Sequence, residues 1–172
     1  MAHSWHELRD EIRAEALRIW FEEPDELKKI RLGVYDPPAG AMGQYFTTWD
    51  FVVGMVRDLA MSPVTPILKL VKNTLFELDH LKAMVTAFLP IYTEFLGYCG
   101  LRTLKKFTDE MINLLPTIKT KEEFYELLSA YSMYCNKLQA WCVHYFPFAL
   151  GFSYKLRSKE EVCELARLVG LT

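Results

Sequence analysis

Apolar side chains recur every three or four residues along most of the chain, and this spacing covers one face of an α-helix. The pattern predicts helices over residues 5–22, 24–32, 48–61, 66–88, 103–115, 121–146 and 159–169. Residues 91–97 are expected to continue the fourth helix at a new angle, because Pro90 kinks or breaks it. No run alternates between polar and apolar residues as a half-buried strand does. The sequence therefore predicts an all-α, single-domain helical bundle of five to seven helices over residues 1–172.

Capping residues mark the helix starts. In a capping box, a hydroxyl accepts from a backbone amide and a Glu three residues later reaches back. The boxes are Ser4–Glu7, Thr120–Glu123 and Ser158–Glu161, and Thr65 with Pro66 marks a further start.

Three predicted helices carry broad apolar faces. The first is expected to bury Leu8, Ile12, Leu17, Ile19 and Trp20. One stripe of the helix over residues 66–88 carries Leu68, Val71, Leu75, Leu78, Leu81, Val85 and Phe88. The helix over residues 48–61 is apolar nearly all round. The bundle is therefore expected to be closely wrapped or joined to a partner.

One connection departs from the helical pattern, over residues 33–48, GVYDPPAGAMGQYFTT. Its glycines and prolines disfavour a helix, and connections longer than about 12–15 residues are usually functional or disordered. Val34, Tyr35, Met42, Tyr45 and Phe46 argue against disorder. We therefore expect one long ordered loop after the first helical pair, forming a wall of a binding site. The alternative is a loop that only caps the core.

Composition and charge narrow the class of protein. The chain is 51% hydrophobic with a formal net charge of −2, and its charges are interspersed. It therefore lacks the basic patch of a nucleic-acid-binding protein. Residues 83–101 are apolar, but Glu94 and Pro90 within them favour a core helix over a membrane span.

The four cysteines, Cys99, Cys135, Cys142 and Cys163, show no C-x-x-C spacing. The amino-terminal residues are polar and do not resemble a signal peptide. We therefore expect buried thiols and a cytoplasmic protein.

Two ionisable residues among apolar neighbours are candidate catalytic groups. Glu94 is expected on a narrow polar seam, where a half-buried carboxylate could act as general acid or base. His144 lies in the most aromatic run of the chain and could transfer a proton. The alternatives are an ordinary ion pair or surface position for Glu94 and a satisfied core histidine for His144.

Candidate substrate-binding residues are Asp50, Arg57, Tyr45, Trp49 and Trp141. The Arg57 guanidinium suits a carboxylate ligand, and Gly54 leaves room for a ligand or for another helix. An ion pair of Arg57 with Asp50 or Asp58 is the alternative.

Metal and cofactor signals are weak. Glu77 and His80 form a single Glu-x-x-His, whereas a di-iron bundle needs two such motifs and two further carboxylates. No Walker loop, Gly-x-Gly-x-x-Gly or His-Glu-x-x-His motif is present. We therefore predict no metal and no cofactor.

The region from Trp5 to Asp58 resembles the helical-bundle half of the cucumopine synthase family. The resemblance is clearest at Ile19-Trp20, at Glu23-Pro24, at Arg31-Leu32-Gly33 and in the loop running into Trp49-Asp50-Phe51. It fades after about residue 62 and so covers about a third of the chain. No catalytic residue of the family can be matched to this sequence.

The resemblance implies a cofactor-independent opine enzyme that condenses histidine with 2-oxoglutarate and closes a ring by a Pictet–Spengler-type reaction. In that family a cyclophilin-like β-barrel precedes the helical domain, and this chain shows none. The resemblance therefore implies either a barrel on another polypeptide or a stand-alone relative.

Two main hypotheses follow. The first is a helical domain that binds a small organic acid or amino acid and is related to these opine enzymes. The second is a non-enzymatic module that forms a homodimer or docks on a separate subunit. A membrane-surface protein is a third, weaker possibility.

Overall fold

The computed structural model describes residues 4–32 and 48–145, without the side chains of residues 48–51, 61, 62 and 145. The described residues contain seven α-helices and no strand, which confirms the predicted all-α bundle. The helices are α1 (Trp5–Phe21), α2 (Asp25–Arg31), α3 (Thr48–Leu59), α4 (Thr65–Leu70), α5 (Leu78–Tyr98), α6 (Arg102–Leu114) and α7 (Lys121–Tyr145). A π-helical segment, η2 (Ala60–Val64), joins α3 to α4, and a 3-10 turn, η3 (Leu115–Thr117), follows α6.

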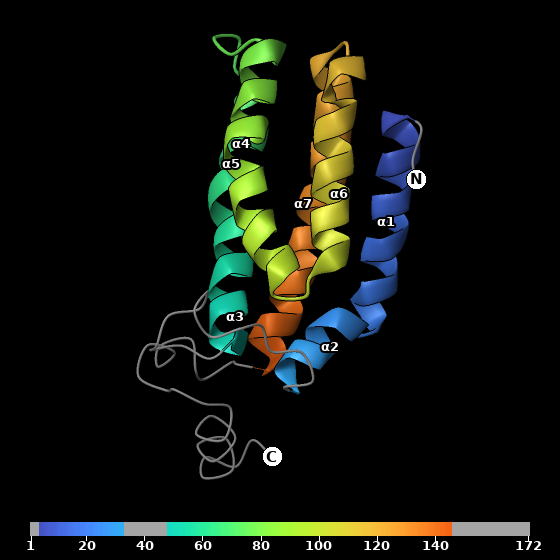
Figure 1. Ribbon diagram of the computed structural model, residues 1–172. Helices are drawn as coiled ribbons and strands as arrows, with labels where there is room; N and C mark the ends of the chain where they lie inside the picture. The colour runs from blue at the N-terminus through green and yellow to red at the C-terminus, as the bar shows by residue number, and fades with distance from the viewer. Residues whose placement is uncertain (1–3, 33–47, 146–172) are drawn as a thin grey trace.

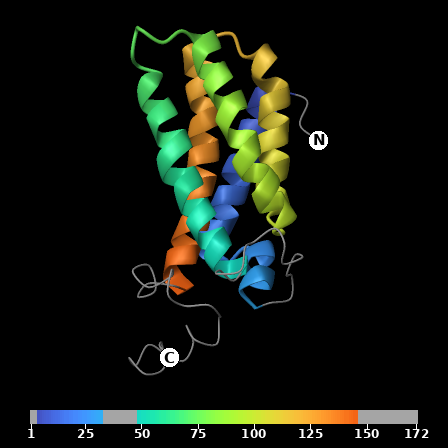
Figure 2. The same cartoon turned by 60° about the vertical axis from the view of Figure 1, so that its left-hand side comes forward.

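The long helices run side by side along one bundle axis (Figures 1 and 2). α7 packs mainly on α1 and also on α3, whereas α5 packs mainly on α6. The short helix α2 turns across the lower end of the bundle in Figure 1.

Helix α7 supplies a large part of the core. Its buried side chains include Phe124, Leu127, Leu128, Tyr131, Tyr134, Cys135, Leu138 and Cys142. Because burying one large apolar side chain stabilises a fold by about 1.5–3 kcal/mol, α7 is a principal source of the bundle's stability.

Two of the three predicted capping boxes lie in the described residues. The Ser4 hydroxyl accepts from the Glu7 amide at 3.2 Å, and the Thr120 hydroxyl accepts from the Glu123 amide at 3.2 Å. Ser158–Glu161 and the helix predicted over residues 159–169 lie outside them.

The helix predicted over residues 66–88 is wrong. α4 ends at Leu70 and α5 begins at Leu78. Between them the Asn73 carboxamide oxygen accepts from the Leu75 amide at 2.9 Å, a side-chain turn that competes with helical hydrogen bonding. Leu75, expected on the buried stripe, is 82% exposed.

Of the two outcomes predicted at Pro90, a kink and a break, the break is wrong, because α5 continues through Pro90 to Tyr98 and includes residues 91–97. A proline inside a helix costs about 3 kcal/mol. Val85 and Leu89 before it and Leu96 after it are all buried. Core packing on both sides of Pro90 therefore outweighs the lost backbone hydrogen bond.

Gly100 ends α5 and turns the chain towards α6. Its φ is 109°, a conformation that favours glycine. The Leu101 amide donates to the Leu96 carbonyl at 2.8 Å and the Gly100 amide donates to the Gly97 carbonyl at 3.0 Å. These two bonds form a Schellman motif, which holds α6 against α5.

Helix α1 buries a narrower face than the sequence predicts. Leu8, Ile12, Ala16 and Ile19 are buried, whereas Leu17 and Trp20 are more than half exposed. Leu17 and Trp20 lie beside the stripe that faces the core, and this leaves an indole on the surface at the lower end of α1.

The described part of the chain contains no helix with the length and hydrophobicity needed to cross a membrane. Cys99, Cys135 and Cys142 carry buried thiols, as the sequence predicts, and Cys163 lies outside the described residues. Burial raises the pKa of the Cys99 thiol to about 11 and that of the Cys142 thiol to about 12.

Candidate functional site

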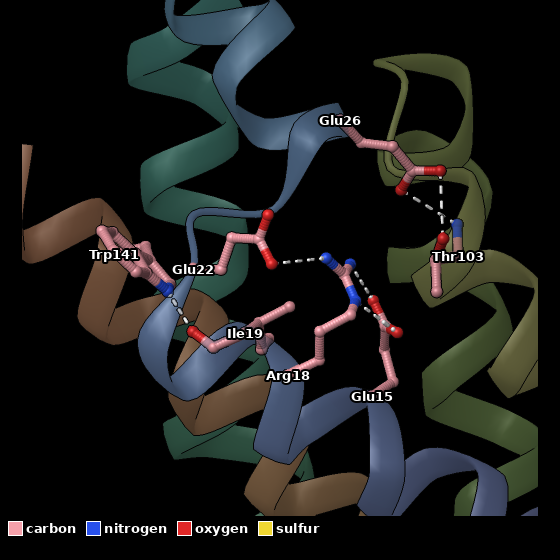
Figure 3. Close-up of polar contacts among 7 residues, drawn as sticks. All are labelled: Glu15, Arg18, Ile19, Glu22, Glu26, Thr103 and Trp141. Carbon is pink, nitrogen blue, oxygen red and sulfur yellow. Dashed lines mark hydrogen bonds and ion pairs between the residues drawn. The ribbon is translucent and has the colours of Figure 1, made fainter.

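The lower ends of α1 and α7 are joined by a hydrogen bond from an indole. The Trp141 Nε1 donates to the Ile19 carbonyl (Figure 3). Ile19 lies in the last turn of α1, where carbonyls have no partner within the helix. Trp141 therefore satisfies a helix end and fixes its own ring at the seam between the two helices.

A cavity of about 370 Å³ lies beside this indole. It is lined by Ile19, Trp20, Lys137, Ala140, Trp141 and His144, and we call it the aromatic cavity. The Lys137 ammonium lies 2.8 Å from the centroid of the Trp20 ring. The Trp141 and His144 rings meet edge to face, with centroids 5.8 Å apart.

The aromatic cavity combines groups suited to one class of ligand. Indole faces bind flat apolar groups, and cations attract both aromatic faces and carboxylates. Lys137 and His144 supply a cation and an imidazole at its wall. The arrangement therefore fits an aromatic acid or aromatic amino acid, with His144 as the group able to accept or donate a proton.

Of the predicted site residues, the structure brings Trp141 and His144 together in this cavity. The alternative of a satisfied core histidine does not hold for His144, since this residue is exposed at the end of α7. Trp20 and Lys137 were not predicted as site residues. A helical wheel of α1 would have indicated Trp20, because it falls beside the buried stripe.

Glu94 does not lie on a half-buried polar seam, because its side chain is 76% exposed. Its carboxylate lies 3.6 Å from the Lys105 ammonium, which also binds Asp109. A Cβ added at Gly97 would meet the Lys105 side chain, so this glycine allows Lys105 to lie close to α5. Glu94 therefore forms an ion pair on the surface, which is the alternative that the sequence analysis gave for this residue.

Arg57 lies on α3 with its guanidinium 3.6 Å from the Asp58 carboxylate, which is the predicted alternative partner. A Cβ added at Gly54 would meet no described atom within 4 Å, so no described helix approaches α3 there. Trp49 and Asp50 belong to the first turn of α3, but their side chains lie outside the description. Tyr45 and the loop predicted over residues 33–47 also lie outside the described residues.

The turn between α1 and α2 is fixed by a two-pronged ion pair. The Arg31 guanidinium donates to the Glu23 carboxylate through Nε at 3.0 Å and through Nη2 at 3.1 Å. These residues belong to Glu23-Pro24 and Arg31-Leu32-Gly33, two of the motifs that carry the family resemblance. Their side chains are largely buried, so the two motifs act together in shaping this end of the bundle.

Two buried polar atoms contribute to none of these contacts. One carboxylate oxygen of Glu110 on α6 and the hydroxyl of Ser129 on α7 have no hydrogen-bond partner among the described residues. No group of three or more His, Cys, Asp or Glu side chains lies together as a metal site in the described ranges.

The fold defines a helical bundle domain with an aromatic cavity at one end. The chain belongs to the family of cucumopine synthase C-terminal helical bundle domains, which it matches over residues 5–145. The resemblance therefore extends well beyond residue 62, where the sequence motifs alone indicated that it fades.

The bundle is also similar to a solved structure described as McbB in complex with tryptophan. The TM-score is 0.77 and the sequence identity is 36%. The alignment covers 88% of this chain and 49% of the McbB chain, so this chain spans about half the length of that protein. A comparison with curated proteins gave no match.

Proposed function

We propose that this chain is the helical half of a cucumopine synthase-type enzyme that uses an amino acid and a keto acid. The observation that carries the proposal is the 36% identity with McbB, a protein whose structure was solved with tryptophan. The chain corresponds to about half of McbB, and the proposal includes a β-barrel subunit that acts together with this helical half.

The aromatic cavity supports binding of an amino acid by this half. Trp141 and Trp20 would contact the apolar part of the ligand, and Lys137 would attract its carboxylate. Tyr45, Trp49, Asp50 and Arg57 remain proposed contributors to the same function. Ring closure through an imine requires positioned reactants and an acid–base group, with no cofactor.

His144 is the better supported of the two candidate acid–base groups. It lines the aromatic cavity next to Trp141. Glu94 is exposed and paired with Lys105. Our proposal therefore assigns the proton transfer to His144, with Glu94 as the second choice.

Titration with tryptophan, histidine and 2-oxoglutarate, followed by calorimetry and thermal shift, tests the proposal. We expect one amino acid to raise the melting temperature, and we expect Trp141→Phe, His144→Gln and Arg57→Ala to weaken its binding. The matched controls are His80→Gln and Arg13→Ala, two exposed positions on other faces. The proposal is wrong if none of the three compounds binds, or if the variants and their controls bind equally well.

A second candidate function is a non-enzymatic module that dimerises or docks on a partner. The observation that favours it is the number of large apolar side chains on the surface. Those in the described residues are Leu17, Trp20, Phe21, Leu32, Leu75, Phe88, Ile91, Phe95, Tyr98 and Tyr125. Light scattering tests this second function. A chain that stays monomeric alone and also when a β-barrel half is added would exclude both dimerisation and docking.

A further inference from the structure

A groove of about 950 Å³ opens between the first half of α5 and the end of α6. Its lining residues lie within residues 78–87 and 112–119, and we call it the aliphatic groove. The two helices approach closely where Lys105 lies against Gly97, and they diverge towards the upper end of the bundle (Figures 1 and 2). Ala83 and Ala87 line the space left by this divergence, and their side chains are too small to fill it.

The walls of the aliphatic groove are mostly hydrocarbon. Apart from Asp79, Lys82, Thr86 and Lys119, the lining residues are leucine, isoleucine, alanine and proline, and none of the described residues that line it is aromatic. The Thr86 hydroxyl donates to the Lys82 carbonyl at 2.9 Å, so its proton is satisfied without a ligand. An aromatic ligand gains from contacts between rings, which this lining does not offer. The groove therefore suits an aliphatic ligand.

Two lysines meet at one edge of the groove. The Lys82 Nζ donates to the Ile118 carbonyl at 2.7 Å, and Lys119 is the next residue after Ile118. Because an ammonium carries three N–H donors, the half-buried Lys82 is fixed in place and keeps donors for a ligand. Within the described ranges neither lysine forms an ion pair. Both ammonium groups can therefore bind a carboxylate.

We propose that the aliphatic groove binds a medium-chain aliphatic carboxylic acid. The carboxylate of the ligand accepts from Lys82 and Lys119, and its chain lies on Ala83 and Ala87. Apolar walls with a few polar groups that fix orientation are the general form of a small-molecule site. This inference goes beyond the proposed function, because the aromatic cavity lies at the other end of the bundle (Figure 1).

Charge favours an anion as the occupant. Asp79 supplies one carboxylate at the rim of the groove, against the two ammonium groups of Lys82 and Lys119. Glu123, whose carboxylate accepts from the Lys119 amide at 3.4 Å, is not among the lining residues. Opposite charges attract more strongly at a half-buried site than in open water. A neutral or cationic chain would leave the positive excess of the groove uncompensated.

The length of the groove sets the length of the acid. Side chains on a helix lean towards its amino terminus, so Lys82 reaches the upper end of the groove, where it meets Ile118. From Leu78 to Ala87 the rise of α5 is about 14 Å. An extended hydrocarbon chain advances about 1.2 Å per bond, so an acid of about ten carbon atoms spans this distance.

Calorimetric titration of the native chain with sodium decanoate tests the proposal. We expect a dissociation constant of about 10–100 µM. From hexanoate to decanoate each added CH₂ should tighten binding by up to about fourfold, because it buries further apolar surface. Dodecanoate should gain little more, since the groove ends at Ala87. Decanol and decylamine should bind at least about tenfold more weakly than decanoate, because neither supplies a carboxylate.

Two variants locate the binding. Ala87→Leu fills the groove and should weaken decanoate binding at least about tenfold, whereas Ala14→Leu, at an exposed alanine of α1, should not change it. Lys119→Gln should weaken decanoate binding about threefold to tenfold and leave decanol binding unchanged. Its matched control is Lys28→Gln, at an exposed lysine of α2. Circular dichroism and thermal unfolding check that each variant is folded.

Four results would overturn the proposal. The first is a native chain that does not bind decanoate at about 1 mM, and the second is equal binding of decanoate and decanol. The third is decanoate binding that weakens in Trp141→Phe but not in Ala87→Leu, which would place the acid in the aromatic cavity. The fourth is a change of mass in light scattering caused by Ala87→Leu alone, which would make the groove a protein contact. None of these titrations contains an amino acid, so their failure leaves the proposed function untouched.

Discussion

Glu26 of α2 caps the amino end of α6 through Thr103, which lies 77 residues further along the chain (Figure 3). The Glu26 carboxylate accepts from the Thr103 amide at 3.1 Å and from the Thr103 hydroxyl at 3.0 Å. The residue at the capping position of α6 is Leu101, whose side chain cannot accept a hydrogen bond. A distant carboxylate therefore replaces the local cap and ties α2 to the bundle.

Glu26→Ala should lower the free energy of unfolding by about 1–2 kcal/mol, because it leaves the Thr103 amide at the start of α6 without its acceptor. Glu26→Gln should cost less, since one acceptor oxygen remains. Urea denaturation measures both. Lys28→Ala, at an exposed position on the same helix, serves as control and should change stability by less than about 0.5 kcal/mol. Equal effects of Glu26→Ala and Lys28→Ala would contradict the capping role.

Arg31→Lys should destabilise the turn between α1 and α2 although it keeps the positive charge. A lysine cannot reproduce the two parallel hydrogen bonds that Arg31 makes with Glu23. We expect a loss of about 1–3 kcal/mol, measured by urea denaturation, because the pair is largely buried. Arg13→Lys on the exposed face of α1 is the control, and an Arg31→Lys variant as stable as that control would refute the prediction.

Glu110→Gln should stabilise the protein. Glu110 is 7% exposed, and one of its carboxylate oxygens has no hydrogen-bond partner in the part of the chain that the structure describes. A neutral amide costs less to bury than a carboxylate, so we expect a gain of about 1 kcal/mol in thermal or urea denaturation. Glu22→Gln at an exposed position should leave stability within about 0.5 kcal/mol of the native value. A loss of stability in Glu110→Gln would show that the charged form is held by its surroundings.

Stability should fall in alkaline solution. Burial raises the pKa of Cys99 from 9.0 to about 11 and that of Cys142 from 9.0 to about 12. The unfolded chain therefore loses these protons first, so each thiol lowers the free energy of unfolding by about 1.4 kcal/mol per pH unit between its unfolded and folded pKa. Below pH 9 the contribution of the two thiols to the free energy of unfolding does not change with pH.

Urea denaturation between pH 7 and pH 11 tests this dependence. Cys142→Ala should reduce the slope above pH 9 by about 1.4 kcal/mol per pH unit. The Cys142→Ala substitution also removes packing contacts in the core. That loss is the same at every pH, so it does not change the slope. An unchanged slope would mean that the Cys142 thiol ionises as easily in the folded protein as in the unfolded chain.

Periodicity and capping residues were sufficient for the class of fold and for most helix positions. The starts at Ser4 and Thr120 follow from hydrogen bonds that close within three residues. Such local bonds depend on neighbouring residues alone, so the amino-acid order specifies them. The family motifs at Glu23 and Arg31 were also visible in the sequence, and the structure shows that they bind each other.

Tertiary packing decided the features that depend on partners far along the chain. α5 continues through Pro90 because buried residues on both sides of it pack in the core. The helix propensity of the neighbouring residues does not predict this packing. The cap from Glu26 to Thr103 and the meeting of Trp20 with Trp141 and His144 join segments about 75 to 125 residues apart. A periodic pattern indicates that a face is apolar, but only the packed bundle determines whether that face is covered. Leu17, Trp20, Phe88 and Ile91 are therefore exposed where their spacing alone predicts core or a covered helix.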